Sequence, residues 1–389
     1  MPRPPAARVV IGITLVVALG AAFVGLPPYW RAAALVVRAA DLRSPWLRPL
    51  ASWGRHAVIS EDVLVPAGRA RLRGRLYRPA GRTPSLAVVL ASGVNPRGLD
   101  EPRLERFART IAASGIAVLT PELPDLLDFT ITPRITDQIE QTVMWASRDP
   151  RLAPDGRIGL VGISFSGGLS VVAAGRPGLR DRVRFVVSLG GHGDLPRTLE
   201  YLCTGLQPDG RRRPAHDYGV AVILHNVVEA VVPPEQVDAL RTGIRGFLVA
   251  STVYVTDQRE GLRLFEEARA QEARLPEPAR TWLHWVNTRD VGALGPRLVA
   301  RLPTFAADSA LSPERSPAPT APVYLLHGVE DNVIPAIEST IAARSLEARG
   351  VRVRTLITPL VSHAEARQGP SGGDVWQLVS FWAAVLRSP

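Results

Sequence analysis

The sequence contains a single cysteine, Cys203, and no lysine at all. One cysteine excludes a disulfide framework within the chain. The seven histidines are scattered, without the spacing that is typical of a zinc site, so we expect no metal. All 46 basic residues are arginines, and with 36 acidic residues they give a formal net charge of +10.

Nucleotide-binding and nucleic-acid-binding motifs are also missing. No G-x-G-x-x-G follows the first predicted strand and no Walker sequence occurs, which predicts a reaction without a cofactor. The arginines accompany abundant alanine, glycine and proline, a composition that indicates codon bias rather than a selected basic face. Because no zinc finger, basic heptad helix or RNA-binding aromatic motif is present, we predict no nucleic-acid partner. A weak attraction to anionic lipid headgroups is left open.

A long apolar run lies near the N-terminus, at residues 9–26. Its length of about 18 residues just spans a bilayer core. Tyr29 and Trp30 follow it, a pair that suits the membrane interface. We expect residues 1–30 to form a transmembrane anchor, with a cleaved signal segment, and hence a secreted or periplasmic protein, as the alternative. The arginines before and after the run nearly balance, so the orientation is left open.

From residue 56 onward, short β-branched runs alternate with helical patterns, as in a mostly parallel sheet covered by helices. The predicted strands are 57–65, 70–78, 86–91, 116–120, 157–163, 183–189, 323–327 and 351–357. The predicted helices between and after them are 102–114, 133–147, 165–174, 334–348 and 373–386.

The alternation stops between residues 194 and 321, an interval too long for a loop in a compact domain. Helical patterns at 220–232, 234–248 and 260–274 predict a helical insertion that acts as a lid. The chain is therefore expected to divide into five parts: the anchor or signal segment 1–30, an interfacial linker 31–55, a first core part 56–194, the lid insertion 195–320 and a second core part 321–389.

A serine lies between an apolar strand and a small-residue helix. The stretch 157–168 reads Arg-Ile-Gly-Leu-Val-Gly-Ile-Ser-Phe-Ser-Gly-Gly, with Ser164 at the expected turn. Gly162 and Gly167 leave room for the helix to pack against the strand, as a nucleophile elbow requires. Ser166 replaces the final glycine of the G-x-S-x-G pattern, so a glycine- and serine-rich turn without catalysis is the rival interpretation.

Two later strands are each followed by a residue that suits a catalytic triad. Asp331 follows the strand at 323–327 in a His-Gly-x-x-Asp sequence, and His363 lies in a loop after the last strand. The order Ser, Asp, His is the one that α/β-hydrolases use. On these motifs, the sequence resembles the α/β-hydrolase superfamily over residues 56–194 and 321–389. The expected fold is an α/β-hydrolase fold with a mostly parallel sheet of about eight strands, helices on both faces and a helical lid.

Each of the three residue types has a chemical role. A serine hydroxyl is a weak nucleophile, so His363 is expected to take its proton while Asp331 fixes the imidazole tautomer. Asp194 is the alternative acid, or else the N-cap of the first insertion helix. Two remaining histidines are given lesser roles: His327 is expected to brace a turn, and His192 to line the pocket.

The oxyanion of a tetrahedral intermediate needs two preorganised N–H donors. Phe165, directly after the nucleophile, offers one N–H. The second is expected from Val94 in the loop after the third strand, where Gly93 allows close approach and Pro96 has no N–H to give.

The predicted activity is hydrolysis of an ester, with an amide or thioester less favoured, through an acyl-enzyme on Ser164. The insertion and the membrane anchor together favour a small lipophilic ester, or one resident in the membrane, as substrate. Two alternatives are kept: an acyltransferase on the same fold, and a non-catalytic, membrane-tethered binding protein.

Overall fold

The computed structural model describes residues 27–40, 47–84, 86–361 and 372–388. The predicted apolar run 9–26 and His363 lie outside these residues. Among the helices of the described ranges, none combines the length and the apolar character needed to cross a membrane.

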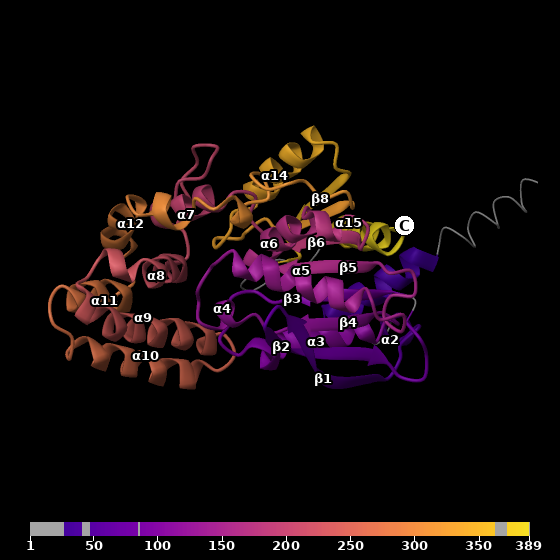
Figure 1. Cartoon of the computed structure of the whole chain (residues 1–389), viewed down its shortest axis with the longest axis horizontal. Helices are drawn as coiled ribbons and strands as arrows, with labels where there is room; N and C mark the ends of the chain where they lie inside the picture. The colour runs from indigo at the N-terminus through magenta and orange to yellow at the C-terminus, as the bar shows by residue number, and fades with distance from the viewer. Residues whose placement is uncertain (1–26, 41–46, 85, 362–371, 389) are drawn as a thin grey trace, which may run out of the picture.

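A sheet of eight strands forms the centre of the molecule (Figure 1). The strands follow the order β1-β2-β4-β3-β5-β6-β7-β8, in which β2 pairs antiparallel with β1 and β4 and all other pairs are parallel. Every predicted strand is confirmed to within two residues. Their bounds are β1 Val58–Ala67, β2 Ala70–Pro79, β3 Ala87–Ala91, β4 Ala117–Pro121, β5 Ile158–Ile163, β6 Val183–Leu189, β7 Val323–Gly328 and β8 Val353–Thr358.

Helices cover both faces of this sheet. Successive side chains of a strand point to opposite faces, and in β3 Val88 and Leu90 join one apolar cluster while Val89 joins the other. The first cluster is covered by α3 (Pro102–Ala112), α15 (Gly372–Leu386) and a helix at residues 27–39, and the second by α5 (Arg134–Ala146), α6 (Phe165–Ala174) and α14 (Ile337–Ala348). The expected α/β-hydrolase architecture is confirmed.

The helix at residues 27–39 belongs to the core of the protein. Ala32, Leu35 and Val36 lie at i, i+3 and i+4, so they share one face of the helix, and that face is buried with α3 and α15. This packing differs from the interfacial linker expected at 31–55, because these apolar side chains meet protein rather than lipid. The folded part of the chain therefore begins before residue 56.

A helical insertion separates β6 from β7, as the sequence predicts, and extends beyond one end of the sheet (Figure 1). Its helices α8, α9 and α10 correspond to the three predicted helical patterns, and the sequence patterns missed the others. The bounds are α7 Leu195–Thr204, α8 Asp217–Asn226, α9 Pro234–Tyr254, α10 Gln258–Glu272, α11 Ala279–Asn287, α12 Val291–Val299 and α13 Leu302–Phe305. Short helices elsewhere are α2 Arg48–Ser52 and α4 Pro124–Leu127, with 3-10 turns η2 Gly98–Asp100, η3 Pro177–Leu179, η4 Val228–Ala230 and η5 Ser309–Leu311.

Candidate active site

Ser164 lies at the sharp turn that joins β5 to α6. Its backbone has φ 56° and ψ −130°, a conformation that a residue with a side chain rarely adopts. Such a residue costs on the order of 1–3 kcal/mol and persists only where its surroundings hold it. Here the Ser164 N–H donates to the carbonyl of Leu189 at 2.8 Å, and its carbonyl accepts from the N–H of Gly167 at 2.7 Å. The turn therefore has the strained geometry of a nucleophile elbow.

Two glycines make this turn possible. A Cβ on Gly162 would lie 2.1 Å from the carbonyl oxygen of Ser166, and one on Gly167 would lie 2.5 Å from the Ser188 hydroxyl oxygen. Neither approach is possible for real atoms, so a side chain at either position would push α6 away from β5. The space beside Gly162 is occupied by backbone of the turn, and the space beside Gly167 by the Ser188 side chain of β6.

The two serines of the motif have different surroundings. Ser166 is fully buried, and its hydroxyl donates to the carbonyl of Ser92 at 2.5 Å. Ser164 is partly exposed at the turn. A buried hydroxyl that already donates to a carbonyl is not available to a substrate, which is consistent with Ser164 as the predicted nucleophile.

The loop after β3 passes directly beside Ser164. A Cβ on Gly93 would lie only 3.3 Å from the Cβ of Ser164, and Val94 follows with part of its side chain packed on the core. Phe165 is the first residue of α6, where a backbone N–H has no partner within the helix and the helix dipole favours negative charge. These positions suit the predicted oxyanion hole, whose use of the Val94 and Phe165 N–H groups stays a prediction.

Asp331 follows β7 in a buried turn. One carboxylate oxygen, Oδ1, accepts from the N–H groups of Val333 at 2.9 Å and Ile334 at 3.0 Å. The other, Oδ2, lies 3.4 Å from Nε2 of His327. The backbone N–H groups stabilise the ionised carboxylate, which is the form a triad acid needs.

His327 braces this turn, in line with its expected role. It is fully buried, its Nε2 lies 2.8 Å from the carbonyl oxygen of Ile334, and its Nδ1 lies 2.7 Å from the hydroxyl oxygen of Ser339. A carbonyl only accepts, so Nε2 carries a proton and donates to Ile334. The ring is thereby held between the turn and α14.

Asp194 has a structural task. Its Oδ1 caps α7 by accepting from the N–H of Arg197 at 3.0 Å, and its Oδ2 accepts from Nε of Arg315 at 2.5 Å. The N-cap interpretation of Asp194 is thus confirmed. Both carboxylates are engaged in hydrogen bonds, so the choice of Asp331 over Asp194 as the triad acid stays a prediction.

His363 lies outside the described residues, but the chain that leads to it is placed. Thr358, the last residue of β8, pairs with Gly328 at the end of β7, and Thr358 also accepts from the N–H of Val329 at 3.1 Å. The two strands therefore end side by side, at the edge where Asp331 lies. The chain that leads to His363, five residues after Thr358, therefore leaves the sheet at the edge that the predicted triad requires.

His192 packs behind the elbow. It is buried, its Nε2 lies 2.8 Å from the carbonyl oxygen of Leu311, and its ring centroid lies 5.4 Å from that of Phe165. Burial lowers the pKa of His192 below its usual value, so the ring is neutral. The expectation that His192 lines the pocket is wrong for this buried ring, which fills space beside Phe165 and α6.

Sequence reasoning missed a buried ion cluster beside the site. Nε of Arg197 donates to Glu338 at 2.6 Å, and its NH2 group donates to Glu314 at 2.6 Å. Glu338 also accepts from the N–H of Gly193 at 3.0 Å. Burial opposes the charge of Arg197, but the hydrogen bonds to Glu314 and Glu338 hold its pKa above the usual value. No local pattern reveals this cluster, because its members come from three distant parts of the chain.

A metal-binding cluster is absent from the described residues. In the part of the chain that the structure describes, no three His, Cys, Asp or Glu side chains are grouped as ligands. Burial raises the pKa of the Cys203 thiol to about 12, so this cysteine is neutral at physiological pH.

No protein-family model and no curated protein matches this chain. Among solved structures, it is similar to a hyperthermophilic esterase from the archaeon Pyrobaculum calidifontis, with 16% identity, 99% of each chain covered and a TM-score of 0.48. It is also similar to the acylaminoacyl peptidase of Pyrococcus horikoshii, with 13% identity and a TM-score of 0.48 over 88% of this chain, which spans 43% of that one. A putative dienelactone hydrolase from Klebsiella pneumoniae has 14% identity and a TM-score of 0.44, with coverage of 85% and 99%.

The fold is that of the α/β-hydrolases, as the sheet order and the helices on its two faces show. At sequence identities of 13–16%, the similarity does not establish the activity or the substrate. Both are therefore argued from the residues of the site.

Proposed function

We propose that this chain is a serine hydrolase that cleaves an ester bond through an acyl-enzyme on Ser164. The observation that carries the proposal is the strained backbone of Ser164 at the end of β5, with the Gly93 loop directly beside it. A strained residue at a turn that close packing enforces is typical of a functional site.

Each step of the reaction has a residue to perform it. Ser164 attacks the carbonyl carbon while His363 takes its proton, and the N–H groups of Val94 and Phe165 stabilise the oxyanion. His363 then returns the proton to the leaving alcohol. Water attacks the acyl-enzyme with His363 again as base, and Asp331 stabilises the imidazolium in both steps.

Turnover of short p-nitrophenyl esters by the full chain tests this function. A fluorophosphonate probe should give one adduct, and peptide mass spectrometry should place it on Ser164. Product analysis with an added alcohol separates hydrolysis from acyl transfer, because only an acyltransferase would give mostly the new ester. Absence of both turnover and adduct would favour the non-catalytic binding protein.

We further propose that the insertion acts as a lid, because α8 connects two sides of the site. At its start, the N–H of His216 donates to the carbonyl of Asn332, the neighbour of Asp331, at 2.9 Å. At its end, Asn226 donates to the carbonyl of Phe129 at 2.8 Å and accepts from the N–H of Ile131 at 3.1 Å. The helix is thus tied to the loops after β7 and β4, which border the catalytic edge.

Asn226→Ala should change the preference of the enzyme for acyl-chain length by roughly three- to tenfold in kcat/KM, since it releases one end of α8 and each lost hydrogen bond costs about 1 kcal/mol. The measurement is kcat/KM across p-nitrophenyl esters of increasing length. Asn287→Ala is the matched control, because Asn287 donates to Glu272 at 3.0 Å within the insertion itself. Equal profiles for both variants would argue against a lid.

We also propose that residues 1–26 attach the protein to a membrane. The apolar run ends where the described helix at 27–39 begins, and that helix packs in the core. A chain that starts at residue 27 should therefore keep its esterase activity and lose flotation with liposomes, whereas the full chain should float. If the shortened chain still floats after a high-salt wash, another surface provides the attachment. The N-terminal sequence of the mature protein distinguishes the anchor from a cleaved signal.

A further inference from the structure

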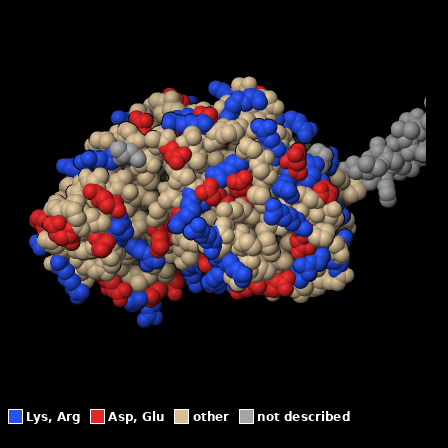
Figure 2. All heavy atoms as spheres, in the orientation of Figure 1, with Lys and Arg blue, Asp and Glu red and all other residues tan. Residues whose placement is uncertain are grey.

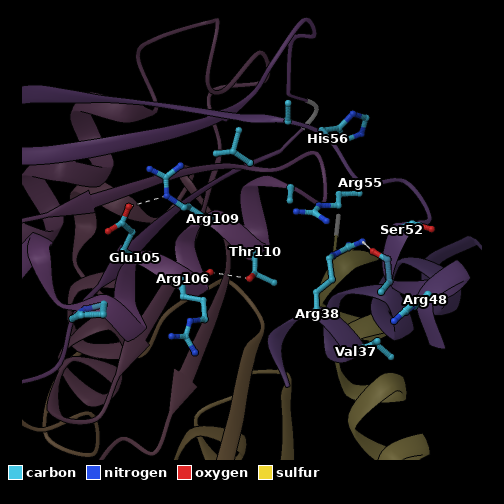
Figure 3. Close-up of a pocket in the computed structure, with 15 residues that line it drawn as sticks. Val37, Arg38, Arg48, Ser52, Arg55, His56, Glu105, Arg106, Arg109 and Thr110 are labelled. Atoms are coloured by element: carbon cyan, nitrogen blue, oxygen red, sulfur yellow. Dashed lines mark hydrogen bonds and ion pairs between the residues drawn. The ribbon is translucent and has the colours of Figure 1, made fainter. Parts of the chain in front are cut away.

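A hollow of about 1340 Å³ lies away from Ser164, between the helix at 27–39, α2, α3 and the start of β1 (Figure 3). None of the predicted catalytic residues lines it. Five arginines and one acidic residue, Glu105, line this hollow, and the arginines come from all three helical segments and from the link to β1: Arg38, Arg48, Arg55, Arg106 and Arg109.

Most of this positive charge is not compensated. Glu105 pairs with Arg109 at 2.8 Å. The other four arginines have no ion pair with any carboxylate in the described part of the chain. This differs from the face in Figure 2, where basic and acidic side chains are interspersed. Four unpaired cations around one concave site attract an anion.

Arg38 is fixed at the wall of the hollow by neutral groups. Its guanidinium donates to the carbonyl of Ala51 at 3.1 Å and to the hydroxyl of Ser114 at 2.7 Å, while its Nε is buried with no hydrogen-bond partner. Burial, together with the nearby charge of Arg55, lowers the pKa of Arg38. Figure 3 shows Arg55 extending toward the space between Arg38 and α3. An anion between Arg38 and Arg55 would reduce the repulsion between the two guanidinium groups and would accept a hydrogen bond from the buried Nε of Arg38.

The shape and chemistry of the hollow suit a phosphate that carries an organic group. Guanidinium groups match phosphate oxygens in geometry and charge. The volume exceeds what a single phosphate fills, and apolar side chains share the lining: Val37, Ala51, Val58, Pro102 and Ala113.

Exposed tryptophans, one of them beside the hollow and two near the start of the helix at 27–39 and on α15, favour a lipid as the source of that phosphate. Trp53, whose carbonyl accepts from Arg38 at 3.2 Å, is 45% exposed. Trp30 and Trp376 are 53% and 60% exposed, and Trp376 stacks on Tyr29 with ring centroids 5.4 Å apart. Exposed tryptophans are characteristic of the membrane interface, and Tyr29 and Trp30 follow the apolar run almost directly.

We propose that this arginine-lined hollow binds the phosphate group of an anionic lipid at the membrane surface. The choice of a lipid rests on the proposed membrane attachment, whereas the binding of an anion rests on the four unpaired arginines alone. Neither depends on the hydrolase activity.

The test measures how tightly short-chain phospholipids and phosphate bind to the full chain in neutral detergent micelles. The protein carries Ser164→Ala, so that no ester is cleaved during the titration. Calorimetric titrations use dihexanoyl phosphatidylglycerol, dihexanoyl phosphatidylcholine and inorganic phosphate. Phosphatidylglycerol should bind, and Arg55→Gln with Arg106→Gln should weaken its binding by about a hundredfold or more, the loss expected for two charge-assisted hydrogen bonds. Affinity should fall as salt is raised.

Arg259→Gln with Arg274→Gln is the matched control, since both arginines are exposed at the ends of α10 and the net charge changes equally. This pair should alter the affinity less than twofold, and the melting temperatures should show that both double variants fold. Inorganic phosphate bound as tightly as phosphatidylglycerol would overturn the assignment to lipid. Equal binding of phosphatidylcholine, no binding at all, or an equal loss in both double variants would overturn the anion site.

Discussion

Ser164→Ala should lower kcat for p-nitrophenyl esters by about 10³- to 10⁶-fold, because the oxyanion hole and substrate binding alone remain. Alanine keeps a Cβ, so the strained turn is retained and the protein should fold. Steady-state kinetics give the loss of activity, and intact-protein mass spectrometry should show no fluorophosphonate adduct.

Ser166→Ala is the control for this variant. It removes the hydrogen bond that Ser166 donates to the carbonyl of Ser92, next to the Gly93 loop. The loop that presents the Val94 N–H should loosen, and kcat should fall by roughly fivefold, as for one lost hydrogen bond of about 1 kcal/mol. The fluorophosphonate adduct should still form on Ser164. An adduct on Ser166, or full activity in Ser164→Ala, would reverse the assignment.

Asp331→Asn should lower kcat by about 10⁴-fold, since an amide cannot stabilise the imidazolium and favours the wrong tautomer of His363. The fold should be kept, because the amide oxygen can still accept from the N–H groups of Val333 and Ile334. The measurement is kcat together with the free energy of unfolding.

Asp194→Asn, in contrast to Asp331→Asn, should leave kcat nearly unchanged. An asparagine can still cap α7, but it loses the ion pair with the half-exposed Arg315, so the variant should lose up to about 1 kcal/mol of stability while its kcat changes by less than about tenfold. A large loss of kcat in Asp194→Asn with little change in Asp331→Asn would make Asp194 the triad acid.

The strands and the elbow were predictable because their signals are local. The central strands β3, β4 and β5 are short apolar runs, and the turn at Ser164 depends on glycines within a few residues of it. The contact between Ser166 and Ser92 was not predictable, since it joins residues that are distant in sequence and meet only when β3 and β5 pair.

The helix at 27–39 shows a second limit of the sequence. Apolar residues at positions 32, 35 and 36 define one face of a helix, but the same pattern suits a lipid surface and a protein core equally. Its packing against α3 and α15 depends on segments far along the chain. The length of α8 was also overestimated, because the apolar residues that continue the pattern after Asn226 lie in the η4 turn.

The ion cluster of Arg197, Glu314 and Glu338 limits how the insertion can move. Glu338 belongs to α14 of the core, and it holds both Arg197 in the first turn of α7 and the N–H of Gly193 just before it. Only Glu338 of this cluster is fully buried, and breaking its hydrogen bonds to Arg197 costs about 1.5–3 kcal/mol, so this attachment stays closed during fluctuations that cost less. Gly205 ends α7 in a left-handed conformation with φ 66°. The segment that follows, up to the start of α8 at Asp217, is tied to the loop after β7 through Arg213 and His216. Opening of the proposed lid would therefore have to break these contacts, with α7 remaining part of the core.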